Sequence, residues 1–538
     1  MDFSGEHAPA TQPGFALQRA SIMLLLPVAL WIWLCWDWPA RLGFYCDDWM
    51  ILLHPFVGTR EAFRDLARDL VTRPVSIPFV WLAQVIVDWS PVRSQVLNAA
   101  MLLVTAASVG LLAAELTSAV SGLRHAALVG ASVAAAAFII FPSTVGTFAW
   151  GVGVIAVVPA LPLFCIGMTL ILRSEGHGWK LALGLLMTLL SHLSYEAFYF
   201  QEITFVLIAA VLGGRGIKDL PWTAIVGAIL INVGCVLFNR LTAGGVHKTF
   251  YWDFLHAFAG GYRSVLAILG HAAREHKILI GISVLTAGLA GALCLAQRIG
   301  HARVQIALLL TICGVVAAGL LYAFAGYSLA AEGPMARVSI VLATYYSIAS
   351  GLLAAAAWGA RNRLPALLPA SLPPLAFWVF AAISFGGLAV TDRYRVGEWA
   401  DTWSHELARL SRLPASITTP EASASAGQRI YLAVEERTPA YLEPATATYE
   451  ITGAVAWAIY QHTNSRLSMI DIWRGSQTVP RWFGTAYNWF NRWDGKNFEQ
   501  GPCQGPVAGT LSGTELWTWD TSSGALVKVE PPWQLGCQ

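Results

Sequence analysis

The chain alternates long apolar runs with short polar connections almost as far as residue 390. A helix needs about 20 apolar residues to cross roughly 30 Å of hydrocarbon, and most of these runs are near that length. We predict about eleven such crossings. They cover residues 19–38, 94–118, 125–142, 152–172, 179–194, 197–213, 221–240, 277–296, 304–324, 337–358 and 370–390. The pattern predicts an all-α polytopic membrane domain over residues 19–390, after a cytoplasmic tail of residues 1–18.

The composition supports a membrane protein. Of the 538 residues, 56% are hydrophobic and 12% are charged, against roughly 25% charged in a typical soluble protein. The formal net charge of +2 gives no reason to expect a nucleic-acid partner. We therefore expect the partners to be membrane lipids and substrates at the membrane surface.

Basic residues in the short connections set the orientation, because Lys and Arg favour the cytoplasmic side. If Arg19 lies inside, the basic residues of every second connection lie inside too: Arg124, Arg173, Lys180, Arg215, Lys218, Arg298, Arg303, Arg361 and Arg363. The alternation places four segments outside, namely residues 39–93, 143–151, 241–276 and 325–336, together with the tail after residue 391. Counting the apolar residues 73–89 as a span would invert this order, so we predict that they form an interfacial helix in the first outer loop.

The tail, residues 391–538, predicts a small α/β domain on the outer side of the membrane. It begins with an amphipathic stretch at 398–413. Strand-like segments at 429–435 and 467–473 then flank a helix-like segment at 449–462. Cys503 and Cys537 could form a disulfide there if the tail faces an oxidising compartment.

Two adjacent acids follow the first span, in the sequence GFYCDDWMILLHP over residues 43–55. Asp47 and Asp48 lie where we expect water to reach them, and His54 and Arg73 share the same outer segment. A carboxylate in such a position can act as a general base, and Asp48 could also bind a metal. The alternative is an interfacial loop whose acids only end a helix.

This arrangement resembles the GT-C membrane glycosyltransferases. An acidic pair after the first span, interfacial helices and an Arg-Pro before the second span are shared with lipid A aminoarabinose transferases, protein O-mannosyltransferases and bacterial O-antigen glucosyltransferases. The resemblance implies transfer of a sugar from a polyprenyl-phosphate carrier to a periplasmic glycan or glycolipid acceptor at a bacterial inner membrane. Asp47 or Asp48 would be the base, and Arg73 and Arg337 would bind the phosphate.

Further polar residues are candidates for the wall of the substrate site. His54 lies beside the acidic pair, and His192, Tyr195 and Glu196 lie at the outer junction of two spans, where acids usually face a cavity or a partner. Some GT-C relatives carry another acidic ligand in the second outer loop, but residues 141–153 contain no acid. A divalent metal cation is therefore left open as a cofactor.

Two other functions remain open. A polysaccharide polymerase or ligase of the O-antigen type would also have many spans and outer loops, with outer arginines and a histidine as its main residues. A lipid or glycan transporter would carry polar residues near mid-membrane or broken spans in paired halves. In this chain the ionisable residues gather at one face instead, which favours an enzyme.

Overall fold

The computed structural model describes sixteen helices and eight strands with a few flanking residues. The described parts are residues 25–45, 48, 52, 57–121, 124–141, 143–151, 153, 157–174, 176–242, 259, 301–324, 339–360, 372–411, 457 and 461, and the strands bounded below. Every structural statement that follows concerns these residues.

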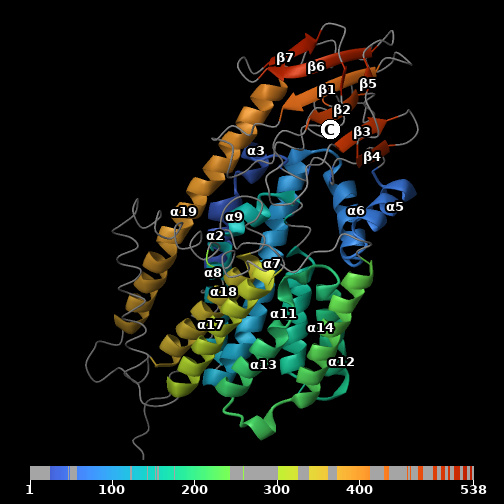
Figure 1. The fold of residues 1–538 in the computed structure, drawn as a ribbon. Helices are drawn as coiled ribbons and strands as arrows, with labels where there is room; N and C mark the ends of the chain where they lie inside the picture. Colours follow the sequence, from blue (N-terminus) through green and yellow to red (C-terminus); the bar gives the residue numbers. More distant parts are fainter. Residues whose placement is uncertain are drawn as a thin grey trace, which may run out of the picture.

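The helices form a bundle that contains most of the described chain (Figure 1). The 3₁₀ helices are η1 (Glu196–Phe198) and η2 (Ile217–Asp219). The α-helices are α2 (Leu25–Cys35), α3 (Trp38–Arg41), α5 (Arg60–Asp69), α6 (Ser76–Val87), α7 (Pro91–Ser121), α8 (Arg124–Ile139), α9 (Ser143–Phe148), α11 (Ala160–Leu172), α12 (Gly178–His192), α13 (Gln201–Leu212), α14 (Trp222–Thr242), α17 (His301–Phe324), α18 (Ile340–Ala360) and α19 (Leu372–Leu410).

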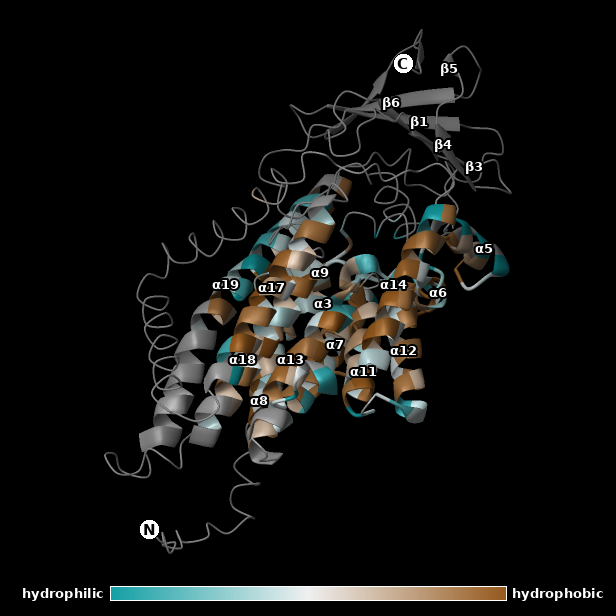
Figure 2. Ribbon diagram, turned by 60° about the horizontal axis from the view of Figure 1, so that its bottom comes forward, coloured by the Kyte–Doolittle hydropathy of each residue, from teal (hydrophilic) through white to brown (hydrophobic). Residues whose placement is uncertain are grey.

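The predicted spans coincide with these helices, except for residues 277–296, which lie outside the described residues. Three stretches are long and apolar enough to cross a membrane by length and composition, namely Pro91–Ser118, Trp222–Thr242 and Gln305–Tyr322. Several shorter apolar helices accompany them. Most of the described helices consist of hydrophobic residues, and hydrophilic residues lie on α5 and at several helix ends (Figure 2). A multi-pass membrane domain follows, while the number of crossings stays a prediction.

Small residues bring neighbouring helices close together. A Cβ atom on Gly351 of α18 would lie 2.6 Å from the carbonyl oxygen of Gly130 on α8. A Cβ on Gly184 of α12 would lie 2.8 Å from the carbonyl oxygen of Gly167 on α11. Such close backbone approach through glycine is a common way to pack helices inside a membrane, where the hydrophobic effect between helices is weak.

The connections between helices gather at two ends of the bundle. At the basic end, the Thr223 hydroxyl donates to the carbonyl of Gly176 at 2.5 Å, and the Arg303 side chain covers Gly214. The opposite end, which we call the site end, contains the segments before α7, between α8 and α11, and between α12 and α13. Among the described residues, the basic connections after α11 and after α13 therefore lie against the starts of α14 and α17.

Helix α19 differs from its prediction. The predicted span 370–390 and the predicted helix 398–413 are one continuous helix, Leu372–Leu410. Its 39 residues correspond to a length of about 58 Å at 1.5 Å per residue, well beyond the roughly 30 Å of hydrocarbon. The boundary expected at residue 391 thus falls inside a helix, which runs along one side of the bundle (Figure 1).

Strands follow in the tail. Their bounds are β1 Arg429–Glu435, β2 Ile470–Gly475, β3 Trp489–Trp493, β4 Phe498–Pro502, β5 Val507–Ala508, β6 Thr514–Asp520, β7 Ala525–Val529 and β8 Gln534–Leu535. Six of them form a sheet in the order β4-β3-β2-β1-β6-β7, and β5 pairs with β8. β1 is parallel to β2 and β6, and the other pairs are antiparallel.

The two strands predicted from sequence are therefore present, as β1 and β2. Parallel neighbours need a crossover connection of a dozen or more residues, usually a helix, and the predicted helix 449–462 lies in the connection between these strands. Within it the structure describes Trp457 and Gln461, both in helical conformation. The α/β class of the tail remains a prediction, and Cys503 and Cys537 lie outside the described residues.

Candidate functional site

The acidic loop, residues 42–48, follows α3 at the site end. The Asp48 N–H donates to the Tyr45 carbonyl and the Asp48 carbonyl accepts from Leu52 N, both at 2.9 Å. Its carboxylate accepts backbone N–H groups from Tyr45 and Gly151, each at 3.1 Å. Asp48 is 0% exposed, so the expectation that water reaches it is wrong: the carboxylate joins the first outer loop to the second.

Glycine at position 151 makes this contact possible. A Cβ there would lie 3.0 Å from the Asp48 Oδ1 atom and 2.7 Å from a methyl carbon of Leu52. Both distances are tighter than normal van der Waals contact. Gly151 therefore brings its N–H close to a buried carboxylate that needs donors.

Gln95, at the start of α7, joins the same two loops. Its Nε2 donates to the Gly43 carbonyl at 2.6 Å and to the Ala149 carbonyl at 2.9 Å. Gln95 is fully buried. A single amide group thus fixes the acidic loop and the second outer segment to one helix end.

Aromatic residues of α19 hold the acidic loop from its other side, in a group that we call the aromatic clamp (Tyr45, Trp399, Trp403 and Trp457). The Tyr45 hydroxyl donates to the Trp399 carbonyl at 2.9 Å, and the two rings meet edge to face at 4.6 Å. Trp403 contacts Trp457 at 5.6 Å between ring centroids. The Trp457 indole donates to the Trp89 carbonyl at 3.1 Å, so the clamp also reaches the connection before α7.

An ion-pair cluster fastens α19 to the helices before the loop. Arg393 donates to both carboxylate oxygens of Asp37, and its contact with Oδ1 measures 2.6 Å. Its guanidinium also donates to the Leu34 carbonyl at 3.2 Å, and Arg41 donates to Asp37 at 3.2 Å. These contacts fix the register of α19 against α2 and α3.

Arg73 forms a second polar group at the site end. Its Nε and Nη2 donate to the two carboxylate oxygens of Glu196 at 3.0 and 2.8 Å, and its guanidinium lies over the Tyr195 ring at 5.0 Å. The Ser76 hydroxyl donates to the Ser194 carbonyl at 2.9 Å, which holds the two segments together. Three predicted site residues, Arg73, Tyr195 and Glu196, therefore meet in a partly exposed cluster.

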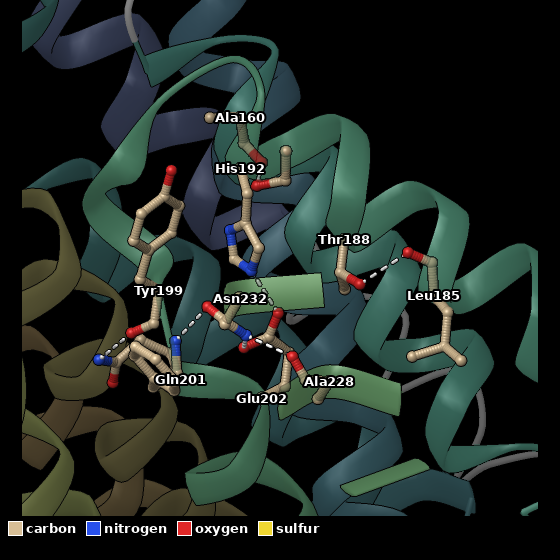
Figure 3. Close-up of polar contacts among 11 residues, drawn as sticks. Ala160, Leu185, Thr188, His192, Tyr199, Gln201, Glu202, Ala228 and Asn232 are labelled. Carbon is tan, nitrogen blue, oxygen red and sulfur yellow. Dashed lines mark hydrogen bonds and ion pairs between the residues drawn. The ribbon is translucent and has the colours of Figure 1, made fainter. Parts of the chain in front are cut away.

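His192 belongs to a separate, buried network (Figure 3). Its Nε2 lies 2.5 Å from the Glu202 carboxylate, which also accepts from Asn232 Nδ2 at 3.2 Å. The Asn232 side-chain oxygen accepts from Phe200 N at 2.7 Å. His192 and Glu202 have side-chain exposures of 0%, so this network ties α12, α13 and α14 together inside the bundle.

Known proteins give one structural resemblance. The archaeal oligosaccharyltransferase AglB from Archaeoglobus fulgidus, in complex with an inhibitory peptide and a dolichol-phosphate, aligns with a TM-score of 0.34 and 12% identity over 91% of this chain and 74% of that one. No family profile and no curated protein matches the sequence. Since a resemblance at this TM-score does not establish an activity, the function proposed below rests on the residues of this chain.

The remaining candidates divide as follows. Asp47, His54 and Arg337 lie outside the described residues, so their roles stay predictions. Among the residues that the structure describes, there is no group of three or more His, Cys, Asp or Glu side chains suited to a metal ion. Binding of a metal ion would therefore have to involve Asp48 or residues outside the described ranges.

Sequence reasoning did not identify Gln95, Gly151 or the aromatic clamp. Gln95 lies near the start of a long apolar run. Burying an amide there is costly unless it has hydrogen-bond partners, so its position was the one feature of the sequence that could have indicated a structural role. Gly151 and Trp403 contact the acidic loop from distant parts of the chain. No local pattern reports such contacts.

Proposed function

We propose that the protein is a membrane glycosyltransferase that moves a sugar from a polyprenyl-phosphate carrier to a glycan or glycolipid acceptor. Its place would be a bacterial inner membrane, with the site end and the tail facing the periplasm. The observation that carries the proposal is the gathering of a buried carboxylate and an arginine–carboxylate pair at one end of an apolar helical bundle. Lipid-borne substrates reach such a position from within the bilayer.

Sugar transfer needs a base for the acceptor. The acceptor hydroxyl oxygen attacks the anomeric carbon of the donor, and its proton passes to a carboxylate. The acidic pair Asp47 and Asp48 supplies this group. Because Asp48 already accepts two backbone N–H groups, it holds the loop in place, and we assign the proton transfer to Asp47 with Asp48 as its positioning partner.

The leaving group needs a cation. As the bond between the anomeric carbon and the phosphate oxygen breaks, its electron pair stays on that oxygen, and negative charge builds up there. Arg73 is one of the described cations at the site end, and Glu196 and Tyr195 fix its guanidinium plane. Arg337 is its proposed companion, and a divalent cation would serve the same purpose if one binds near Asp48.

A transfer assay tests this function. The purified full-length protein is given a panel of polyprenyl-phosphate sugars together with cell-envelope glycan acceptors, and the Asp47→Asn and Asp48→Asn variants are measured beside it. We expect Asp47→Asn to lower kcat by at least about a hundredfold, the usual contribution of a general base. We expect Asp48→Asn to lower both kcat and the melting temperature.

Asp88→Asn is the matched control. Asp88 lies in the same outer segment, and its pairing with Arg93 at 3.4 Å is largely solvent-exposed, so little free energy depends on it. Its backbone is left-handed, with φ of 45°, which asparagine tolerates well. Full turnover in Asp47→Asn would remove the base assignment, and absence of transfer by the wild type with every donor would remove the function.

A further inference from the structure

A second group of polar side chains lies behind the acidic loop. These side chains are buried, and each leaves at least one nitrogen or oxygen atom without a hydrogen-bond partner among the described residues. The polar cluster consists of Trp38 on α3, Ser94, Gln95 and Asn98 on α7, Ser143 on α9 and Asp392 on α19. None of them is more than 2% exposed.

The helices that contain the cluster members contact one another. Ser94 and Gln95 are four and three residues before Asn98, so all three share one face of α7. Helix α3 contacts α7 and α19, and α9 contacts α7 and α19 as well. The Arg393–Asp37 ion pair holds the two neighbouring residues, Asp392 and Trp38, at the same height.

The cluster is also adjacent to the acidic loop. Gln95 uses its Nε2 for the carbonyls of Gly43 and Ala149, while its Oε1 has no partner. One side chain thus touches the loop that contains Asp48 and at the same time belongs to the cluster. A ligand group bound by Gln95 would therefore lie next to the loop that contains Asp48.

Native proteins contain few buried polar atoms without partners, so several in one place call for an explanation. The donors and acceptors of the cluster define which ligand fits. Trp38 and Asn98 offer N–H donors, whereas Gln95 and Asp392 offer acceptor oxygens, and the serine hydroxyls do both. N–H donors disfavour a metal ion, because they cannot coordinate it.

Neutral hydroxyl groups satisfy both kinds of partner, because each hydroxyl donates one hydrogen bond and accepts others. We propose that the polar cluster binds the hydroxyl groups of the sugar on the carrier lipid, so that it is the sugar-recognition subsite of the reaction proposed above. The inference rests on that proposed function. In this inference Arg73 binds the phosphate of the carrier, and the face of α7 that contains Ser94, Gln95 and Asn98 binds the sugar ring.

All members of the cluster are buried in this structure, so a sugar can reach them only if the contacts of Gln95 are exchanged. The two carbonyls that Gln95 binds belong to the acidic loop and to the second outer segment, which cover this face of α7. When the sugar enters, its hydroxyl groups replace these carbonyls as partners of the Gln95 amide. Binding of the sugar and rearrangement of the acidic loop are therefore coupled.

Thermal stabilisation by ligand tests the subsite without relying on turnover. The full-length protein in detergent is melted alone, with bare polyprenyl phosphate, and with each polyprenyl-phosphate sugar of the panel. We expect at least one sugar-bearing carrier to stabilise the wild type more than the bare carrier, because only the sugar contacts the cluster. Ser94→Ala and Asn98→Asp should reduce this difference while the response to the bare carrier persists.

Ser108→Ala is the matched control on the same helix. Ser108 is also buried, but its hydroxyl already has a partner, because it donates to the Thr105 carbonyl at 2.7 Å. In the transfer assay we expect about a tenfold rise in KM for the donor in Ser94→Ala, a change worth about 1.4 kcal/mol, with kcat little changed. Ser108→Ala should leave KM unchanged.

Three outcomes overturn the inference. One is equal stabilisation of the wild type by bare and sugar-bearing carriers, which means that ordered water alone satisfies the cluster. Another is an unchanged sugar effect in both Ser94→Ala and Asn98→Asp. The last is an equal rise in KM in Ser94→Ala and Ser108→Ala. Failure of the proposed function differs from all three, because the wild type would then transfer no sugar even where it binds one.

Discussion

Replacing Gly43 by alanine tests the contact between α19 and the acidic loop. Gly43 lies directly against the Trp403 indole, and an alanine Cβ would lie 2.1, 2.2 and 2.4 Å from three atoms of this ring. Carbon atoms in contact are normally about 3.5–4.0 Å apart, so the ring must move by more than about 1 Å. Trp403 is itself packed against Phe44 and Trp457, which leaves it little room.

Overpacking of this kind usually costs about 1–3 kcal/mol. Alanine also lowers the conformational entropy of the unfolded chain, which stabilises the folded protein by about 0.4–1 kcal/mol. We therefore expect Gly43→Ala to lower the free energy of unfolding by about 1–2 kcal/mol. A melting experiment on the purified protein, followed by intrinsic fluorescence, measures this change.

A double-mutant cycle identifies the cause. Trp403→Leu removes the ring that Gly43→Ala would strike, so the double variant should be more stable than the sum of the single effects by about 1 kcal/mol or more. Gly397→Ala is the control, because it lies on the same helix with nothing within 4 Å of its added Cβ. It should stabilise by up to about 1 kcal/mol. Additive effects of Gly43→Ala and Trp403→Leu would refute the proposed contact.

Three further substitutions test the polar groups. Arg73→Lys removes the bidentate contact with Glu196, and the coupling free energy between Arg73→Lys and Glu196→Gln in a double-mutant cycle should be about 1–2 kcal/mol. Arg93→Lys, at the exposed pair with Asp88, should change the free energy of unfolding by less than about 0.5 kcal/mol. Glu202→Leu leaves His192 and Asn232 buried without their partner and should cost about 3–5 kcal/mol, of which the double variant with His192→Phe should recover a part. Asp392 lies beyond the predicted span 370–390, and burial raises the pKa of its carboxyl well above the ordinary value, partly offset by Arg395. A raised pKa means that the contribution of this carboxyl to stability is fully present below its unfolded pKa of about 3.9 and is lost as pH rises toward the folded pKa. Melting temperatures of Asp392→Asn should therefore exceed those of the wild type by more at pH 8 than at pH 5, and a constant difference would contradict the argument.

The sequence predicted the helices well because each depends on local composition. A run of about 20 apolar residues is informative by itself, and α7, α14 and α17 show the agreement. The merger of two predicted elements into α19 was missed for the same reason. Charged residues from Asp392 to Arg395 suggest the end of a span, although a helix continues through them when it leaves the hydrocarbon.

The candidate site was predictable in its residue types and much less in its contacts. Arg73 and Glu196 were each chosen for their charge and depth, but they lie 123 residues apart, so their pairing was not visible in the sequence. Asp48 was expected to face water because it follows the first predicted span at its outer end. The donor from Gly151 comes from 103 residues away, and it is this contact that makes burial of Asp48 acceptable.

Continuity of α19 changes how the tail relates to the acidic loop. The boundary expected at residue 391 between the membrane domain and the tail lies inside this helix, which passes through the position without a break. Arg393 fixes the helix to Asp37 before the loop, and Trp399 and Trp403 contact Tyr45 and Gly43 within it. Any tilt of α19 therefore displaces the acidic loop, together with the carboxylate that the loop contains.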